Sequence, residues 1–368
     1  MALKRHVSTS TTAPGAPVAT VVRHSAHGRL PSLRGVHRRR LSTWATVADD
    51  VDVDGQQPKG LVEGSYLHQG ERCPYWKIPG ARPSSSPPVV LVHPVGVGLA
   101  KWFWIPLMIA LQTKSFDSDV YAPDLLGTGG CSAYKAYQGS SSDLAGEWAD
   151  QLRSFIANEV QEPAVVVTQG ALGTVGIELA AGSNNTNLVK GLVMSTPPSW
   201  EAVSSEFNPL VRGAIWNLLT WPGGHSPFGK AFYQYASTEK FLRQFSSKNL
   251  FSSAEKVTDA WITKIISEAR PADRRFAIIA FLSGLWRRDR VKKMGHLPKS
   301  IPVLGVFGDQ SRTIAAIDEQ RGAEDLRERY ANAMPSMVKA TILPGKNVLP
   351  YERPTEFASV LQEFISSL

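Results

Sequence analysis

The chain has 368 residues, 43% of them hydrophobic and 20% charged, which is typical of a globular protein and not of a disordered or fibrous one. Its formal net charge of +8 comes entirely from the first 48 residues, which carry eight Lys or Arg and no Asp or Glu, so the neutral remainder gives no electrostatic reason to expect a nucleic-acid partner. No apolar stretch reaches the roughly 18 residues of a membrane span, and Cys73 and Cys131 are too few for a disulfide framework or a metal site, so we expect no integral membrane span, no metal and no cofactor.

Residues 1–48 predict a leader. They are basic, free of acidic residues and rich in Ser, Thr, Ala and Val, a composition typical of an organelle transit peptide. A disordered basic arm is the alternative. Residues 49–62, which follow, are polar and acidic and are interpreted as a linker.

Short apolar runs begin after the linker. Tyr66, Tyr75, Trp76 and Ile78 indicate a hairpin at the edge of a sheet. The later runs are continuous and rich in β-branched residues, as buried parallel strands are, and they alternate with helical patterns over residues 143–160, 172–181 and 354–368. This alternation predicts an α/β fold with a doubly wound, mostly parallel sheet. The runs cover residues 89–93, 119–122, 164–168, 191–195, 302–307 and 339–343.

One long segment interrupts the alternation. Residues 198–299 contain helical patterns, at 254–269 and 272–289, but no convincing strand. We interpret this segment as a helical cap inserted between residues 63–197 and residues 300–368, which together form the core.

Two loops carry recognisable motifs at the ends of predicted strands. His93-Pro94-Val95-Gly96 follows the first core strand, and Pro-Asp-Leu-Leu-Gly-Thr-Gly, with Asp124 in it, follows the second. In this order and spacing they resemble the α/β-hydrolase superfamily, whose first loop supplies backbone N–H groups to the oxyanion hole. The resemblance implies that Asp124 stabilises its turn and takes no part in catalysis.

The nucleophile elbow of that family has the pattern G-x-S-x-G between a strand and a helix. This chain has Thr168-Gln169-Gly170-Ala171-Leu172 there. One alignment places Gly170 at the nucleophile and another places Ala171 there. Neither residue has a hydroxyl, a thiol or a carboxylate, so neither alignment supplies a nucleophile.

The acid and base positions also differ from the family pattern. Ser311 stands where Gly-x-x-Asp predicts the acid, while Asp309 would begin the turn. Asn347 stands where the base His is expected, and an amide cannot take a proton from an alcohol near neutral pH. Three independent changes in an intact framework indicate that the Ser-His-acid mechanism is absent.

We therefore interpret the chain as a pseudo-hydrolase of an organelle that binds an apolar small molecule or a protein partner. The rival is an active hydrolase, of the esterase or lipase type, or another enzyme with non-standard catalytic residues. A scaffold without a ligand is a third interpretation. The resemblance extends to chloroplast and cyanobacterial sequences with a similar Gln-Gly-Ala elbow, which favours the plastid, with the mitochondrion as the alternative. The residues expected to contact a ligand are His93, Val95, Gly96, Trp102, Trp104, Gln169 and Gly170.

Overall fold

The computed structural model describes residues 46–47, 56–81, 84, 86–131, 143–182, 188–220, 226–311 and 322–368. Most of the predicted leader and half of the predicted linker, residues 49–55, lie outside these ranges. Within the range expected for the leader, Thr46–Val47 form the short strand β1, which pairs with the next strand. None of the helices in the described ranges is both long and apolar enough to cross a bilayer.

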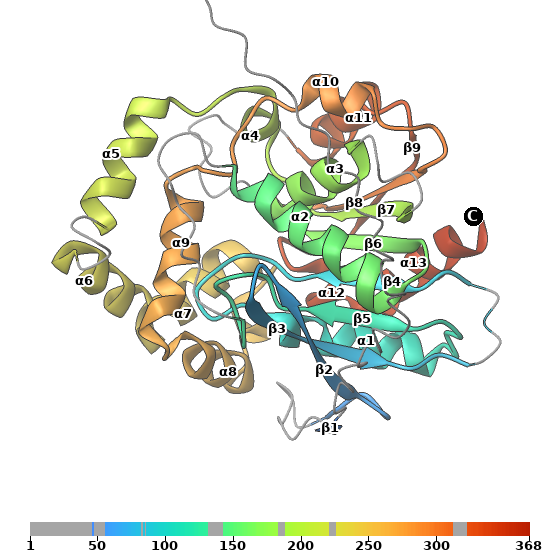
Figure 1. Cartoon of the computed structure of the whole chain (residues 1–368), viewed down its shortest axis with the longest axis horizontal. Helices are drawn as coiled ribbons and strands as arrows, with labels where there is room; N and C mark the ends of the chain where they lie inside the picture. Colours follow the sequence, from blue (N-terminus) through green and yellow to red (C-terminus); the bar gives the residue numbers. More distant parts are fainter. Residues whose placement is uncertain are drawn as a thin grey trace, which may run out of the picture. The chain divides into compact units, whose positions relative to one another are not determined.

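The core is a nine-stranded sheet in the order β1-β2-β3-β5-β4-β6-β7-β8-β9 (Figure 1). The predicted edge hairpin is confirmed: β2 and β3 pair antiparallel, and β3 pairs antiparallel with β5. From β5 to β9 every neighbouring pair is parallel, as predicted. The strands are β2 (Val62–His68), β3 (Glu71–Ile78), β4 (Val89–Val92), β5 (Val120–Pro123), β6 (Ala164–Gln169), β7 (Val189–Ser195), β8 (Val303–Gly308) and β9 (Met337–Leu343).

Helices cover both faces of this sheet, which confirms the doubly wound fold (Figure 1). Successive residues of β4 point to opposite faces: Val90 and Val92 join one buried cluster with residues of α2 and α3, while Val89 and Leu91 join another with residues of α1 and α13. The core helices are α1 (Ile105–Thr113), α2 (Leu144–Phe155), α3 (Gly173–Ala181), α11 (Ala323–Ala333), α12 (Leu349–Glu352) and α13 (Pro354–Ser366).

The described part of the inserted segment is helical and contains no strand, in agreement with the predicted cap. The helix expected over residues 272–289 is shorter than predicted, because Gly284 adopts a positive φ of 76° two residues after α9 ends. The cap helices are α4 (Trp200–Ser204), α5 (Pro209–Thr220), α6 (Pro227–Ala236), α7 (Glu239–Phe245), α8 (Asp259–Ala269), α9 (Arg275–Leu282) and α10 (Val291–Gly295).

Ion pairs hold the cap against the core at two places. The Arg290 side chain is fully buried and contacts Glu178 on α3 at 2.9 Å and Asp143 before α2 at 2.9 Å. Lys256 pairs with Glu352 on α12 at 2.7 Å. Removing one partner of a buried pair leaves a charge without compensation, so these contacts resist displacement of the cap.

The first core loop also touches the cap directly. Gly98 has a φ of 69°, and a Cβ atom added to it would lie 2.1 Å from the backbone oxygen of Ile265 in α8. Only glycine allows this approach of one backbone to another.

Candidate functional site

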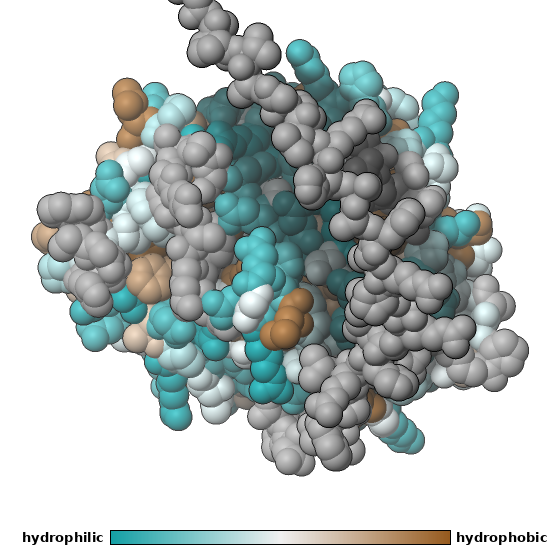
Figure 2. All heavy atoms as spheres, viewed as in Figure 1, coloured by the Kyte–Doolittle hydropathy of each residue, from teal (hydrophilic) through white to brown (hydrophobic). Residues whose placement is uncertain are grey.

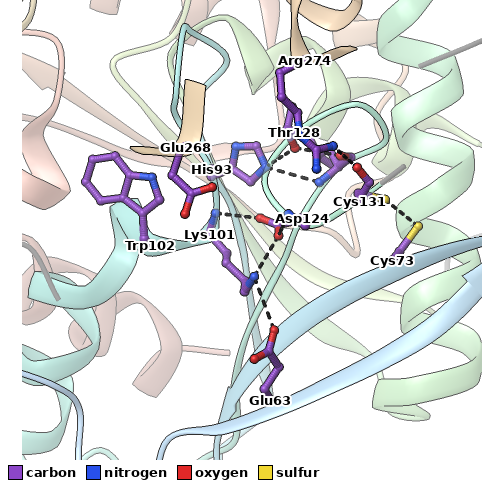
Figure 3. A network of polar contacts seen from close by, with 12 residues as sticks. Glu63, Cys73, His93, Lys101, Trp102, Asp124, Thr128, Cys131, Glu268 and Arg274 are labelled. Carbon is purple, nitrogen blue, oxygen red and sulfur yellow. Dashed lines mark hydrogen bonds and ion pairs between the residues drawn. The ribbon is translucent and has the colours of Figure 1, made fainter. Parts of the chain in front are cut away.

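The Asp124 carboxylate joins the two motif loops at the ends of β4 and β5 (Figure 3). It is fully buried, accepts hydrogen bonds from the backbone N–H groups of Lys101 and Gly130, both at 2.9 Å, and pairs with the Lys101 ammonium at 2.8 Å. Burial alone would raise the pKa of this carboxyl, but the Lys101 charge and the hydrogen bonds outweigh burial, so the pKa is lowered. Asp124 therefore stabilises its turn as an ion, as the resemblance implied.

His93 lies in the same place, with no exposed surface. The backbone N–H of Leu125 lies 3.3 Å from Nε2 and can only donate, so Nε2 accepts and the ring proton sits on Nδ1, which donates to the Pro94 carbonyl at 2.8 Å. Burial lowers the pKa of His93 more than the Asp124 charge raises it. A neutral imidazole with both nitrogens bonded inside the protein connects the two loops and presents no surface to a ligand.

Thr128 completes this loop junction, the name used below for Lys101, Asp124, His93 and Thr128. Its hydroxyl lies 3.1 Å from His93 Nε2 and 2.7 Å from the Leu125 carbonyl, to which it donates. The sequence analysis did not single out Thr128. The signal available was the Gly-Thr-Gly of the second motif, which places a hydroxyl at the end of β5.

Gly170 is one of the two residues that the sequence alignments place at the nucleophile position of the elbow. It follows β6 directly and has a φ of 64°, the sharp turn that this position requires, whereas Ala171 lies in the short 3-10 helix η3 (Gly170–Leu172) that starts there. Apart from Gly170 itself and its two neighbours in the chain, no described residue has an atom within 4 Å of the point where a Cβ on Gly170 would stand. The geometry selects Gly170 over Ala171, and the direction in which a nucleophile would project is open.

Ser311 stands where the family pattern predicts the acid. The Ser311 hydroxyl donates to the Lys346 carbonyl at 2.8 Å, so it fixes the neighbouring turn after β9. Asp309 accepts from the Gly345 N–H at 2.8 Å. As expected, Asp309 begins a turn, and neither side chain contacts a base.

Asn347 stands where the family pattern predicts the base, and its side chain forms a hydrogen bond to the cap. Its Nδ2 donates to the Asn249 carbonyl in the cap at 2.8 Å, while its backbone carbonyl accepts from Gln169 Nε2 at 2.7 Å and from the Thr196 hydroxyl at 3.3 Å. Gln169 is 1% exposed, and Thr196 has a φ of 41°, a region that residues other than glycine rarely adopt. The ends of β6 and β7 and the last loop are thereby tied together across the positions where the sequence pattern places a triad.

Trp102 and Trp104, which we expected to form the wall of a pocket, are 1% and 0% exposed and belong to the core. The Trp102 ring lies 5.2 Å from the Trp261 ring of α8, and the Trp261 ring lies 4.6 Å from that of Tyr351. Edge-on contacts at these distances are favourable aromatic packing. The aromatic residues therefore fill the seam between cap and core.

A small hollow does lie between the motif loops and the cap. Its volume is about 10 Å³, which is room for one water molecule and not for a large apolar ligand. Of the expected ligand contacts, Gly96 lines this hollow; Val95 is half-buried and packs against cap residues. The lining also includes Gly98, Thr128, Gly129, Tyr233, Glu268 and Arg274.

Two further features of the described ranges concern the cysteines and possible metal ligands. Cys73 and Cys131 are buried, and their sulfur atoms lie 2.8 Å apart (Figure 3). The described residues contain no group of His, Cys, Asp and Glu that could hold a metal ion.

The profile of the Alpha/beta hydrolase family matches residues 89–360. No curated protein sequence matches the chain. Among solved structures, Cfl2 from Burkholderia cenocepacia is similar with a TM-score of 0.60 and 17% identity, covering 88% of this chain and 100% of that one. A thermophilic esterase from Thermogutta terrifontis gives 0.58 and 16%, covering 82% and 96%. The serine hydrolase CarC, involved in carbazole degradation, gives 0.62 and 17%, covering 84% and 100%. At these identities the likeness shows the fold alone.

Proposed function

We propose that this chain, which belongs to the Alpha/beta hydrolase family, is a catalytically inactive member that works by binding. The observation that carries the proposal is Gly170 at the elbow, with the φ of a nucleophile position and no side chain to attack a substrate.

The two partner positions support the same conclusion. A Ser-His-acid mechanism needs a base that takes the hydroxyl proton and an acid that orients the base. Here the Asn347 amide donates to Asn249, and the Ser311 hydroxyl donates to Lys346. Neither group can accept a proton near neutral pH.

Such a protein would bind an apolar small molecule or a protein partner. The hollow beside Gly96 and Thr128 holds about one water, so an apolar compound that binds in it would need the cap to move. The buried pair of Arg290 with Glu178 opposes that movement. Between the two occupants, these contacts favour a partner that binds at the surface.

The test uses the full chain. We expect p-nitrophenyl esters to be hydrolysed no faster than in buffer, and a fluorophosphonate probe to leave the protein unlabelled. An active serine hydrolase in the same assay serves as the positive control. Stoichiometric labelling at one residue would overturn the proposal.

A second candidate function has one observation in its favour. The Thr128 hydroxyl lies 3.1 Å from His93 Nε2, within reach of a neutral imidazole, and Thr128 lines the hollow. An enzyme with a Thr nucleophile and a His base is therefore the rival. Against it, Leu125 supplies both an N–H to that nitrogen and a closer acceptor for the hydroxyl proton.

Thr128→Val separates the two functions. If the pair is catalytic, any esterase activity or probe labelling disappears in this variant. If the pair is structural, the variant loses stability and no activity is present to lose. Labelling mapped by mass spectrometry to Thr128 would favour the rival.

We further propose import into an organelle, the plastid before the mitochondrion. Support comes from the eight basic and no acidic residues among the first 48. Residues 1–60 fused to a fluorescent protein should direct it to plastids, or to mitochondria in the alternative. A reporter that stays in the cytosol would contradict this.

A further inference from the structure

Helix α5 presents an apolar face to solvent. Its outward positions follow the helical period, and Leu210 is 83%, Leu218 58% and Val211 46% exposed; Ala214 and Asn217 share that face. Its inward side carries Ile215, Trp216 and Leu219, which are half-buried. A helix with apolar residues on both its inner and outer sides is normally covered on both, but within the described ranges the main packing partners of α5 are the cap helices α6 and α9.

The neighbouring helix α6 extends this surface. Phe228 is 66% and Tyr235 63% exposed, and Ala231 lies between them on the same face. Helices α5 and α6 pack against each other, and Figure 1 shows them side by side at the left, away from the sheet. Figure 2 shows hydrophobic residues in this region, among polar ones. We call Leu210, Val211, Leu218, Phe228 and Tyr235 the outer cap face.

The segment that contains α5 and α6 carries basic residues but no acidic ones. Residues 207–238 contain no Asp or Glu. Lys230 of α6 is exposed, whereas Arg212 of α5 is 2% exposed and turned inward. A surface with exposed Leu and aromatic side chains, an exposed Lys and no acidic group complements the anionic head groups and the outer acyl region of a lipid bilayer.

We propose that the outer cap face docks this protein on the surface of an anionic lipid bilayer. The proposal goes beyond binding of a small molecule or protein and does not depend on whether the elbow is catalytic. Helix α5 has 12 residues, too few to cross a bilayer, so it would lie along the interface. The exposed leucines enter the acyl boundary, and Lys230 stays with the phosphate groups.

A second copy of the chain is the other occupant to consider. If this face met the same face of a second copy, neither copy would supply an acidic residue from 207 to 238 to pair with Lys230. A bilayer supplies that negative charge. The charge pattern therefore favours lipid over self-association.

The experiment is flotation of the full chain with vesicles in which about one lipid in three is anionic. We expect the protein to float with these vesicles. Leu210→Glu combined with Leu218→Glu should weaken binding about tenfold or more, because two side chains no longer leave water. Phe228→Ser with Tyr235→Ser is the second variant, on the other helix. Lys230→Glu should weaken binding to anionic vesicles more than to neutral ones.

Leu67→Glu with Val338→Glu is the matched control, since these residues are 61% and 65% exposed on the sheet strands β2 and β9. It should float as the unchanged protein does, and thermal melts should confirm that all variants fold. The proposal is wrong if the unchanged protein fails to float, if both outer-face variants float normally, or if those variants change only the oligomeric mass in light scattering. Ester hydrolysis is measured separately, so failure here leaves the proposed function untouched.

Discussion

Two regions at the carboxyl ends of the strands differ in the charge and pairing of their side chains. At the loop junction, Asp124 and Lys101 are buried, charged and fully hydrogen-bonded. At the triad positions, Gly170 has no side chain and Asn347 is an uncharged amide bonded to the cap. The junction holds the fold, while the triad positions could change without loss of a buried charge.

In the proposed inactive role, this difference would let the hydrolase framework persist without the Ser-His-acid chemistry. Burying a charge is costly unless it is paired, so each partner at the junction constrains the other. The expected triad positions impose no such constraint, because Gly170 has no side chain and the Ser311 and Asn347 side chains donate ordinary hydrogen bonds to backbone carbonyls. The following predictions test that contrast, from the largest expected effect to the smallest.

Asp124→Ala should destabilise the protein by about 3–5 kcal/mol, because it leaves the buried Lys101 ammonium with only the more distant Glu63 carboxylate, at 3.7 Å. The free energy of unfolding is measured in urea. Lys339→Ala, which removes an exposed pair with Glu363, is the control and should cost less than about 1 kcal/mol. Equal losses in the two variants would contradict the distinction between the regions.

Gly170→Ser should lower stability by about 1–3 kcal/mol, because a side chain at a φ of 64° is strained even where space is open. The variant should remain unlabelled by fluorophosphonate, since Asn347 provides no base. Gly60→Ser is a matched control with a φ of 67° far from the site in sequence. Labelling of Gly170→Ser would mean that a base is present after all.

Stability should fall as the pH is lowered below about 6.5. Burial lowers the pKa of His93 in the folded protein, so the unfolded chain takes up the proton first, and the slope from this group is at most about 1.4 kcal/mol per pH unit. The stability is present above the ordinary histidine pKa and is lost on acidification through it.

Chemical denaturation at several pH values checks this, with His93→Gln expected to flatten the profile. Burial also lowers the pKa of His68, so His68→Gln should remove a separate part of the slope. A profile that stays equally steep in both variants would assign the pH dependence to other groups.

Asn347→Ala should cost about 1 kcal/mol, the net value of one hydrogen bond, because Asn249 loses its donor. Hydrogen exchange should become faster in residues 246–250, where the cap meets the last loop. Asn158→Ala, which breaks an exposed side-chain bond to Ser154, should leave this segment unchanged. Faster exchange in both variants would show that Asn347 has no particular role at the cap.

Most of the core sheet could be predicted because its strands are short, continuous and β-branched. Residues 89–93 predicted β4 (Val89–Val92), and residues 302–307 predicted β8 (Val303–Gly308). Helix α5 was not assigned, because an apolar face turned to solvent removes the periodicity that identifies a helix. The predicted helix over 272–289 ran past Gly284, where the backbone turns.

The sequence predicted which catalytic side chains are not found at the expected positions. It did not predict the contacts that the residues at those positions make. The motif spacing located Gly170, Ser311 and Asn347, but two alignments of the elbow stayed open until the φ of Gly170 was known. Composition could not distinguish an aromatic pocket wall from core packing, so Trp104 was assigned to the wrong environment. The bond from Gln169 to the Asn347 carbonyl spans 178 positions, and no local pattern reports it.

The contact between Gly98 and Ile265 sets a condition for protein engineering. An inserted cap looks exchangeable, because it enters and leaves the core at two points. Here the backbone of the first loop touches the backbone of α8, and a Cβ at Gly98 would lie 2.1 Å from the Ile265 oxygen. A chimera that imports a cap from another hydrolase must therefore import the first loop with it.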